Sequence, residues 1–273
     1  MTEPLAGTPT LHGRAEAWEC DFNGHWNTRF YCRAFQTAAE VAAALDQRAE
    51  DVVVHRRLIR FHSELHSADP IEIRSFALCD AGEAPATAHY MLCHGKPAAT
   101  ALDEEAAPNR ALAPLGRAEA GLALPRGLTG APAAAWTPDP ARDVVVELGP
   151  VGADERRDDG TLRFEPGIAR LAVASHHHAV ALGYTHDFTK QSGIGRMLVE
   201  MRYTRLGSLA RGGFLRGASR LTAASGKSYR SAHLLYDHAG APVALYELCT
   251  LAVDMTARRA TALPAFLRDA VVA

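Results

Sequence analysis

The chain has 273 residues, of which 48% are hydrophobic and 22% charged, and its formal net charge is −2. This composition is typical of a soluble globular protein with one large or two small domains, and the near-neutral charge gives no reason to expect nucleic acid or an acidic membrane as a partner. No apolar run approaches the roughly 18 residues of a membrane-spanning helix. The N-terminus lacks the features of a signal peptide, and the five cysteines are scattered, so we predict a cytoplasmic protein with reduced thiols.

The first distinctive stretch is DFNGH, residues 21–25, in which Asp21, Asn23 and His25 alternate and Gly24 precedes the histidine. Asp and Asn before a helix are common caps and turn formers. The alternative is an active site in which unpaired helix N–H groups near Gly24 and His25 polarise a carbonyl group, while a nearby carboxylate attacks it or activates water. The sequence leaves both interpretations open at this point.

A long helix is predicted directly after this turn, over about residues 27–46. Its apolar side chains recur at helical spacing and form an alanine-rich stripe: Tyr31, Ala34, Phe35, Ala38, Val41, Ala42 and Leu45. Short strands are predicted over about 57–66, 70–80, 85–93 and 97–102. In the first of them His62, Glu64 and His66 alternate, so we expect them on one strand face, where they either line a pocket mouth or face solvent. A long helix on an antiparallel sheet makes an α+β unit.

Residues 105–143 are rich in Ala, Pro and Gly, which predicts a linker or surface crossing that buries little. The predicted domains are therefore residues 8–104 and residues 144–273.

The second domain repeats the order of the first. RDDGT, residues 157–161, matches DFNGH, with Arg157 at the position of Asp21 and Thr161 at that of His25. A later segment pairs Arg60 with Arg202, which places Leu206 opposite Glu64. Three matches in the same order indicate an internal duplication. Because the second copy lacks the Asp, His and Glu, we expect only the first to carry out chemistry.

CDFNGHWNTRFYCRAF resembles the signature of hot-dog-fold acyl thioesterases, roughly D-x-N-G-H-x-N before an aromatic-rich helix, and the two-copy layout resembles double hot-dog thioesterases. The resemblance implies an α+β tandem double hot-dog, each copy a long helix packed on an antiparallel sheet, with the two sheets joined. It implies a catalytic group of Asp21, Asn23 and His25, with Glu64 in FHSELHSAD as the acid of the following strand. Two departures are that the active copy is the first, whereas the plant enzymes use the second, and that Leu65 stands where the family has Cys.

The implied function is hydrolysis of an acyl thioester, acyl-CoA or acyl carrier protein, in fatty acid metabolism, with no cofactor or metal. Asp21 is the first choice for nucleophile or general base, and Glu64 is the alternative base. The residues expected to contact the substrate are Gly24, Trp26, Tyr31, Phe35 and His62. The alternatives are a hot-dog enoyl-CoA hydratase or dehydratase, disfavoured because a D-x-N-P-L-H-like motif is missing, and a non-catalytic acyl-CoA-binding protein. A homodimer of double hot-dogs stays open.

Two further patterns are weighed as sites. The side chains of His176–His178 would point about 100° apart on a helix, which favours a polar face or interface over a shared metal ion. Five arginines between Arg202 and Arg220 are either ordinary surface charge or a patch for a phosphate-bearing carrier.

Overall fold

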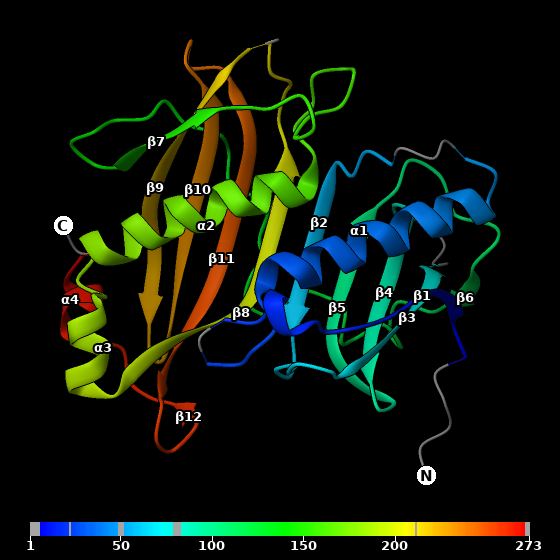
Figure 1. Cartoon of the computed structure of the whole chain (residues 1–273), viewed down its shortest axis with the longest axis horizontal. Helices are drawn as coiled ribbons and strands as arrows, with labels where there is room; N and C mark the ends of the chain where they lie inside the picture. Colours follow the sequence, from blue (N-terminus) through cyan, green and yellow to red (C-terminus); the bar gives the residue numbers. More distant parts are fainter. Residues whose placement is uncertain (1–5, 22, 49–51, 79–82, 211, 271–273) are drawn as a thin grey trace. The chain divides into compact units, whose positions relative to one another are not determined.

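The computed structural model describes residues 6–21, 23–48, 52–78, 83–210 and 212–270. The chain divides into two compact units, Met1–Arg126 (unit 1) and Gly127–Ala273 (unit 2). In each unit a short strand, a polar turn and a long helix precede a series of antiparallel strands (Figure 1). No helix in the described part of the chain has the length and apolar character needed to cross a membrane.

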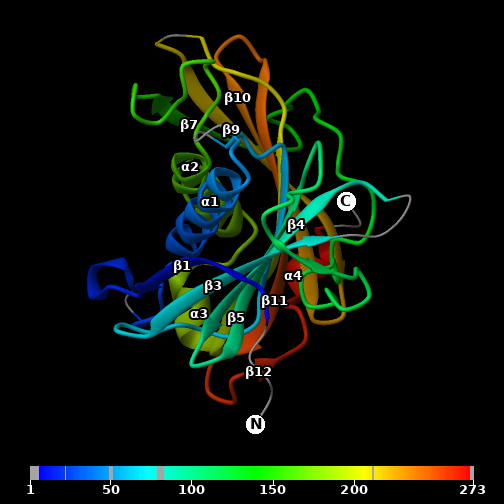
Figure 2. The ribbon, with the colours of Figure 1, turned by 90° about the vertical axis from the view of Figure 1, so that its right-hand side faces the viewer.

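Unit 1 is one sheet with one long helix on it. Its strands follow the order β1-β3-β4-β5-β2, with antiparallel neighbours, and β6 pairs with β3 in parallel. Figure 2 shows α1 lying on one face of this sheet. The elements are β1 (Thr8–Arg14), η1 (Ala17–Glu19), α1 (Thr28–Leu45), β2 (Arg56–Phe61), β3 (Pro70–Leu78), β4 (Ala86–Cys93), β5 (Lys96–Glu104) and β6 (Ala113–Leu115).

The helix predicted over residues 27–46 is confirmed as α1. Asn27 caps it, because its side chain accepts a hydrogen bond from the Arg29 N–H, which helix geometry would otherwise leave unpaired. Most of the predicted stripe is the buried face, with Phe35 and Ala38 0% exposed, but Val41 and Leu45 are 36% and 48% exposed and the prediction is wrong for these two. Full burial of a side chain such as Phe35 stabilises the fold by about 2–3 kcal/mol, and the small alanines let the helix approach the sheet closely.

The strands predicted over 70–80, 85–93 and 97–102 are confirmed within a few residues as β3, β4 and β5. The strand predicted over 57–66 is wrong at its end, because β2 stops at Phe61. There the N–H groups of His62 and Ser63 both turn to the Ala98 carbonyl, so the regular ladder ends. His62, Glu64 and His66 therefore do not share a strand face.

The Ala/Pro-rich segment 105–143 is held more firmly than its composition predicts. Its part in unit 1 contains the short strand β6, and most of its residues are exposed or half-buried, as expected of a segment that buries little. Asn109 donates to the Ala42 carbonyl on α1, and the Arg60 guanidinium donates to three carbonyls between Gly121 and Leu124. Its buried side chains in unit 1 are Asn109, Leu112, Ala120 and Ala123. Hydrogen bonds, more than the burial of apolar side chains, hold this segment in place.

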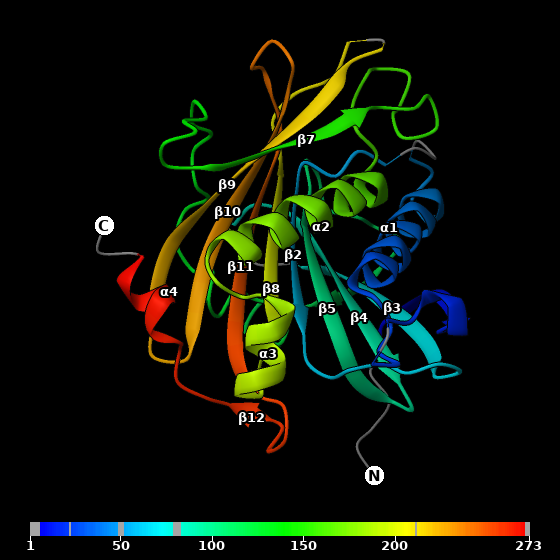
Figure 3. The ribbon, with the colours of Figure 1, turned by 60° about the vertical axis from the view of Figure 1, so that its left-hand side comes forward.

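Unit 2 has the strand order β8-β11-β10-β9-β7, again antiparallel, with β12 paired to β11. Figure 3 shows α2 crossing β9, β10 and β11, with α3 following it. The elements are β7 (Val144–Pro150), α2 (Phe164–Ala181), α3 (His186–Ser192), β8 (Ile194–Arg205), β9 (Phe214–Ser225), β10 (Ser228–Asp237), β11 (Pro242–Asp254), β12 (Arg259–Ala260) and α4 (Ala265–Asp269).

The two units share internal contacts as well as element order. Arg60 and Arg202 both donate to carbonyls of the Ala/Pro-rich segment, between residues 121 and 124 and between residues 128 and 131. Their neighbours Phe61 and Tyr203 pack on aromatic rings of the long helices, Tyr31 of α1 and Phe164 of α2. These contacts support the predicted match of Arg60 with Arg202. Leu206 therefore stays opposite Glu64, and it carries no carboxylate.

Candidate active site

The turn before α1 is closed by the Asp21 carboxylate. Its Oδ1 accepts hydrogen bonds from the N–H groups of Asn23 (2.8 Å) and His25 (3.0 Å). The Asp21 carbonyl accepts the Gly24 N–H at 2.9 Å, and the His25 carbonyl accepts the Asp21 N–H at 2.8 Å. Gly24 has φ +78°, a conformation that suits glycine. Asp21 therefore shapes the backbone that presents His25.

These bonds overturn the prediction that N–H groups near Gly24 and His25 polarise a carbonyl, since the N–H groups of Asn23, Gly24 and His25 already have acceptors. The physical reason is that the helix begins later, at Thr28. The N–H groups of the turn before it donate to acceptors within the turn. Among the described residues, the Thr28 N–H has no acceptor, and it is the first N–H of α1, at the positive end of the helix dipole.

His25 and Glu64 face each other, with His25 Nε2 at 3.3 Å from Glu64 Oε2. Both side chains are accessible, at 20% and 35% exposure. The loop that carries Glu64 is fixed on both sides of Leu65, because its N–H donates to the Tyr31 hydroxyl (2.9 Å) and its carbonyl accepts the Trp26 N–H (2.7 Å). The structure thus brings two of the four predicted catalytic residues into direct contact.

Asn23 is exposed at the tip of the turn, and the described contacts bring its backbone, rather than its amide, to Asp21. Asp21 is partly exposed and lies in the same turn as His25. The structure therefore brings His25 and Glu64 into contact and places Asp21 and Asn23 in the same turn as His25.

Trp26 and Tyr31 form the base beneath the site. Their rings lie 4.6 Å apart, and the Trp26 indole donates to the buried Glu19 carboxylate at 2.7 Å. Arg33 also binds Glu19, and these donors hold the pKa of Glu19 below its usual value although burial opposes them. Burial raises the pKa of Tyr31, so its hydroxyl stays protonated. Both rings are at most 5% exposed, which makes them supports for the loop.

His62 and Phe35 lie apart from the His25–Glu64 pair. His62 Nε2 is 3.0 Å from the Thr100 hydroxyl, which in turn donates to the Leu122 carbonyl. Because alternate residues of a strand point to opposite faces, and Phe61 packs on Tyr31, His62 turns away from α1. Burial, and then the charge of Arg60, lower the pKa of His62. Phe35 is fully buried near His89, farther along the helix.

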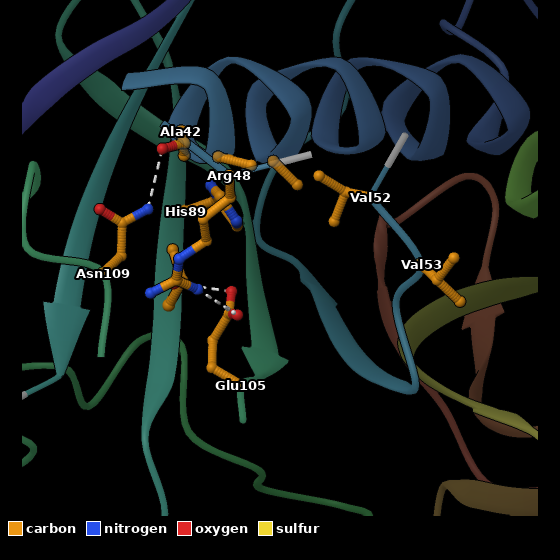
Figure 4. A pocket seen from close by; sticks show the side chains of 10 residues that line it. Ala42, Arg48, Val52, Val53, His89, Glu105 and Asn109 are labelled. Carbon is orange, nitrogen blue, oxygen red and sulfur yellow. Dashed lines mark hydrogen bonds and ion pairs between the residues drawn. The ribbon is translucent and has the colours of Figure 1, made fainter. Parts of the chain in front are cut away.

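A cavity of about 260 Å³ lies beside the C-terminal part of α1 (Figure 4). Figure 4 shows Ala42 above it, with His89 and Glu105 below and the Arg48 guanidinium joined to Glu105. Along the helix, Ala42 is 14 residues beyond Thr28, or about 21 Å at 1.5 Å per residue. The lining residues are Ala39, Ala42, Ala43, Arg48, Val52, Val53, Thr87, His89, Glu105 and Asn109.

Buried charges under the cavity were not anticipated from the sequence. Arg57 binds Asp103 through two bonds, both side chains are nearly fully buried, and Arg57 is the largest influence that lowers the pKa of Asp103, to about 2, against the effect of burial. His89 lies 3.5 Å from Asp103 and bonds to Ser75. The signal in the sequence is the repeat, since Ser219 and His233 form the same pair in unit 2.

The two other sequence patterns do not form a site together. His176 and His177 are exposed, whereas His178 is buried with its ring 5.4 Å from that of His233. Of the five arginines, three are in ion pairs: Arg202 with Glu247, Arg216 with Glu147, and Arg220 with Asp143. Arg211 lies outside the described residues. Ion pairing leaves little of a phosphate patch at these three positions.

Comparison with known proteins identifies a family and several structures that resemble this chain. Residues 15–105 match the family model of the thioesterase-like superfamily. A 12:0-ACP thioesterase from Umbellularia californica has a similar structure, with a TM-score of 0.59, 11% identity, and coverage of 90% of this chain and 94% of that one. An acyl-ACP thioesterase from Bacteroides thetaiotaomicron has a TM-score of 0.54 and 12% identity, with 92% and 100% covered. No curated protein matches the sequence. The predicted resemblance to hot-dog thioesterases is confirmed.

Proposed function

We propose that this chain, whose residues 15–105 match the thioesterase-like superfamily, hydrolyses acyl thioesters at His25 and Glu64. The observation that carries the proposal is the 3.3 Å contact between an accessible imidazole and an accessible carboxylate, inside the matched segment. A general base and a partner that orients it are the groups that water needs to attack a thioester carbonyl.

In this mechanism Glu64 removes a proton from a water molecule, whose oxygen forms a bond to the thioester carbon. His25 orients the carboxylate and the water from its Nε2. The carbonyl oxygen gains negative charge, and the donor we assign to it is the Thr28 N–H at the start of α1. When the carbon–sulfur bond breaks, the proton held by Glu64 passes to the sulfur, so that one water yields an acid and a thiol.

Asp21 has a different role here from the first choice made on sequence alone. Its Oδ1 holds the N–H groups of Asn23 and His25, which fixes the turn and therefore the direction of the imidazole. We assign Asp21 to positioning and Glu64 to base catalysis. Asn23 and Gly24 sit at the exposed tip of the turn, where they meet the thioester end of the substrate.

We assign the acyl chain to the alanine-rich face of α1, with CoA or a carrier protein outside. The support is that the stripe of small side chains leads from the His25 end of the helix to the cavity at Ala39, Ala42 and Ala43. Tyr31 and Phe35 occupy the helix face between them, so their side chains set how far a chain reaches. Matched structures named as ACP thioesterases favour this substrate class.

The architecture that goes with this function is a tandem of two hot-dog domains, with the active copy first, bounded as residues 8–104 and 144–273, in the cytoplasm. The support is the shared element order of the two units and the equivalent contacts made by Arg60 and Arg202 and by Phe61 and Tyr203. A homodimer of such chains fits the same scheme.

The direct test is thiol release from acyl-CoAs of increasing chain length, followed with a chromogenic disulfide reagent. The proposal predicts turnover that depends on chain length. Tight binding of acyl-CoA without thiol release would instead indicate a non-catalytic binding protein. Hydration of crotonyl-CoA, followed by ultraviolet absorbance, would indicate the hydratase alternative.

A further inference from the structure

A second histidine completes a cluster around the His25–Glu64 pair. His25, Glu64 and His66 each offer one ligand atom, and these three atoms all lie within 4.8 Å of one another. A backbone bridge joins His25 to His66, and their rings stand edge to face, with centroids 5.2 Å apart. We propose that these three residues bind a divalent transition metal ion, with zinc as the best fit.

The distances suit such an ion. A tetrahedral zinc ion with bonds of about 2.1 Å needs its ligand atoms about 3.4 Å apart. His25 Nε2 and Glu64 Oε2 are already 3.3 Å apart. Only the His66 ring must move closer, and its side chain is 56% exposed, so a change of rotamer is not blocked by packing.

The surroundings of His66 support a role as ligand. The backbone N–H of His66 donates to Asp69 Oδ2 at 2.8 Å, and the ring Nδ1 is 3.9 Å from the same oxygen. Asp69 lies on the Nδ1 side of the ring, which leaves Nε2 for the metal. Asp69 thus holds the backbone of His66 and lies near its Nδ1.

The ligand set selects the metal. Two imidazoles and one carboxylate are a common zinc set that leaves a fourth position open, and cobalt, nickel and copper accept the same ligands. Calcium and magnesium prefer oxygen ligands and are disfavoured here. Unit 2 has Thr161 at the position of His25, so its corresponding turn offers no such ligand.

The consequence for catalysis rests on the proposed thioesterase function. A metal held by His25 Nε2 and Glu64 occupies the atoms that orient and deprotonate the water. The bound ion therefore inhibits hydrolysis, and His66 serves metal binding alone. His66 therefore takes part in metal binding, whereas His25 and Glu64 take part in both metal binding and hydrolysis.

Binding is tested on tag-free, chelator-treated protein. Titration with cobalt(II), followed by visible absorption, and with zinc, followed by calorimetry, should give one site per chain. His66→Ala should weaken binding of both ions at least about tenfold, because a ligand is lost. The matched control is His12→Ala: His12 also faces a carboxylate, Glu72, at 3.8 Å and is exposed, and this variant should bind as the parent does.

Inhibition is tested by following loss of the thioester absorbance, because zinc would bind a released thiol. Zinc should inhibit the parent and His12→Ala alike, and His66→Ala should need at least about tenfold more zinc for half-inhibition, measured relative to its own metal-free rate. No cobalt or zinc binding by the parent, or equal binding by His66→Ala, overturns the metal site even if hydrolysis is normal. Absence of hydrolysis in metal-free parent protein, with binding intact, counts against the thioesterase function and leaves the metal site standing.

Discussion

The turns before α1 and α2 have the same backbone and different side chains. In both, the first residue donates its N–H to the carbonyl of the fifth, at 2.8 Å in Asp21–His25 and 2.9 Å in Arg157–Thr161, and a glycine with positive φ occupies the fourth position. Asp21 accepts N–H groups in the first turn, and Asp159 accepts the Thr161 N–H in the second. A carboxylate therefore closes both turns, from different positions.

This comparison changes which residues carry the functional argument. Loss of an aspartate at the Asp21 position does not by itself indicate lost chemistry, because Asp159 replaces its structural role. Loss of the imidazole and of the facing carboxylate has no such replacement, since Thr161 and Leu206 stand at those positions. Under the proposed function, the His25–Glu64 pair is the difference between the two turns that matters for catalysis.

The far ends of the two helices differ in a complementary way. In unit 1 Ala42 leaves a cavity beside His89. In unit 2 the aligned helix position is His178, whose buried ring packs against His233, the counterpart of His89. A small residue opens space in the unit with the predicted chemistry, and a large one fills it in the other.

The largest effect should come from removing the imidazole. We expect His25→Ala to lower kcat/KM for acyl-CoA about 10²–10⁴-fold, the usual contribution of acid–base machinery. Thr161→Ala, at the matching position of unit 2, should keep the parent value. Steady-state thiol release measures both. Equal losses in the two variants would show that the two turns do not differ in function.

The next largest effect is on the free energy of unfolding, and it should differ between the two buried ion pairs. Asp103→Asn should lower the free energy of unfolding by about 3–5 kcal/mol, because it leaves the fully buried Arg57 without its charge partner. Glu247→Gln should cost less, since Arg202 also donates to the carbonyls of Leu128, Gly130 and Ala131. Urea unfolding at neutral pH measures both.

The Arg57–Asp103 ion pair should also make the stability of the fold depend on pH. Against the effect of burial, the ion pair lowers the pKa of Asp103 from its ordinary value of 3.8 to about 2, so its stabilisation is present above about pH 4 and is lost as the pH falls toward 2. The difference in stability between parent and Asp103→Asn should therefore shrink over that interval. A difference that stays constant would contradict the ion-pair explanation.

His178 should make unit 2 sensitive to milder acid. Burial, and then the charge of Arg196, lower its pKa to about 4, although Asp143 opposes them. The stabilisation is complete above the ordinary value of 6.5 and is lost as the pH falls to about 4, by about 3 kcal/mol over the interval. His178→Phe should make the stability profile shallower but not flat, because the pKa of buried His233 is also lowered. Urea unfolding at several pH values measures this, and His176→Phe, on the exposed face, should leave the profile unchanged.

The smallest effect tests the cavity. Ala42→His places in unit 1 the residue that fills the matching space in unit 2. If the acyl end reaches this cavity, each methylene excluded costs about 0.8 kcal/mol, so loss of two lowers kcat/KM for the longest accepted acyl-CoA about tenfold. Shorter substrates should be unaffected, and Ala44→His, on the exposed side of α1, should behave as the parent. An unchanged chain-length profile would place the acyl chain elsewhere.

The sequence predicted the parts of unit 1 that depend on local pattern. The spacing of Tyr31, Phe35 and Ala38 defined α1, and the short apolar runs defined β3 to β5, because the burial of one face sets both periodicities. The motif and the repeat together led to His25 and Glu64 before their 3.3 Å contact was visible.

What the sequence did not predict depends on contacts between distant residues. The end of β2 is set by the Ala98 carbonyl, and the position of Glu64 by the Tyr31 hydroxyl. Composition alone also hid the hydrogen bonds of Arg60 that hold the Ala/Pro-rich segment. Local propensity carries no information on such partners, and His66 was accordingly placed on a strand face instead of beside His25.

The central claim is that Glu64 is the base and Asp21 holds the turn. The most direct measurement is thiol release from one acyl-CoA by Glu64→Gln and Asp21→Asn, which have the same loss of charge. Asn at position 21 retains an oxygen for the two N–H groups, so we predict near-parent activity for Asp21→Asn and a loss of about 10²–10⁴-fold for Glu64→Gln. The reverse order, or parent activity in both variants, would contradict the account.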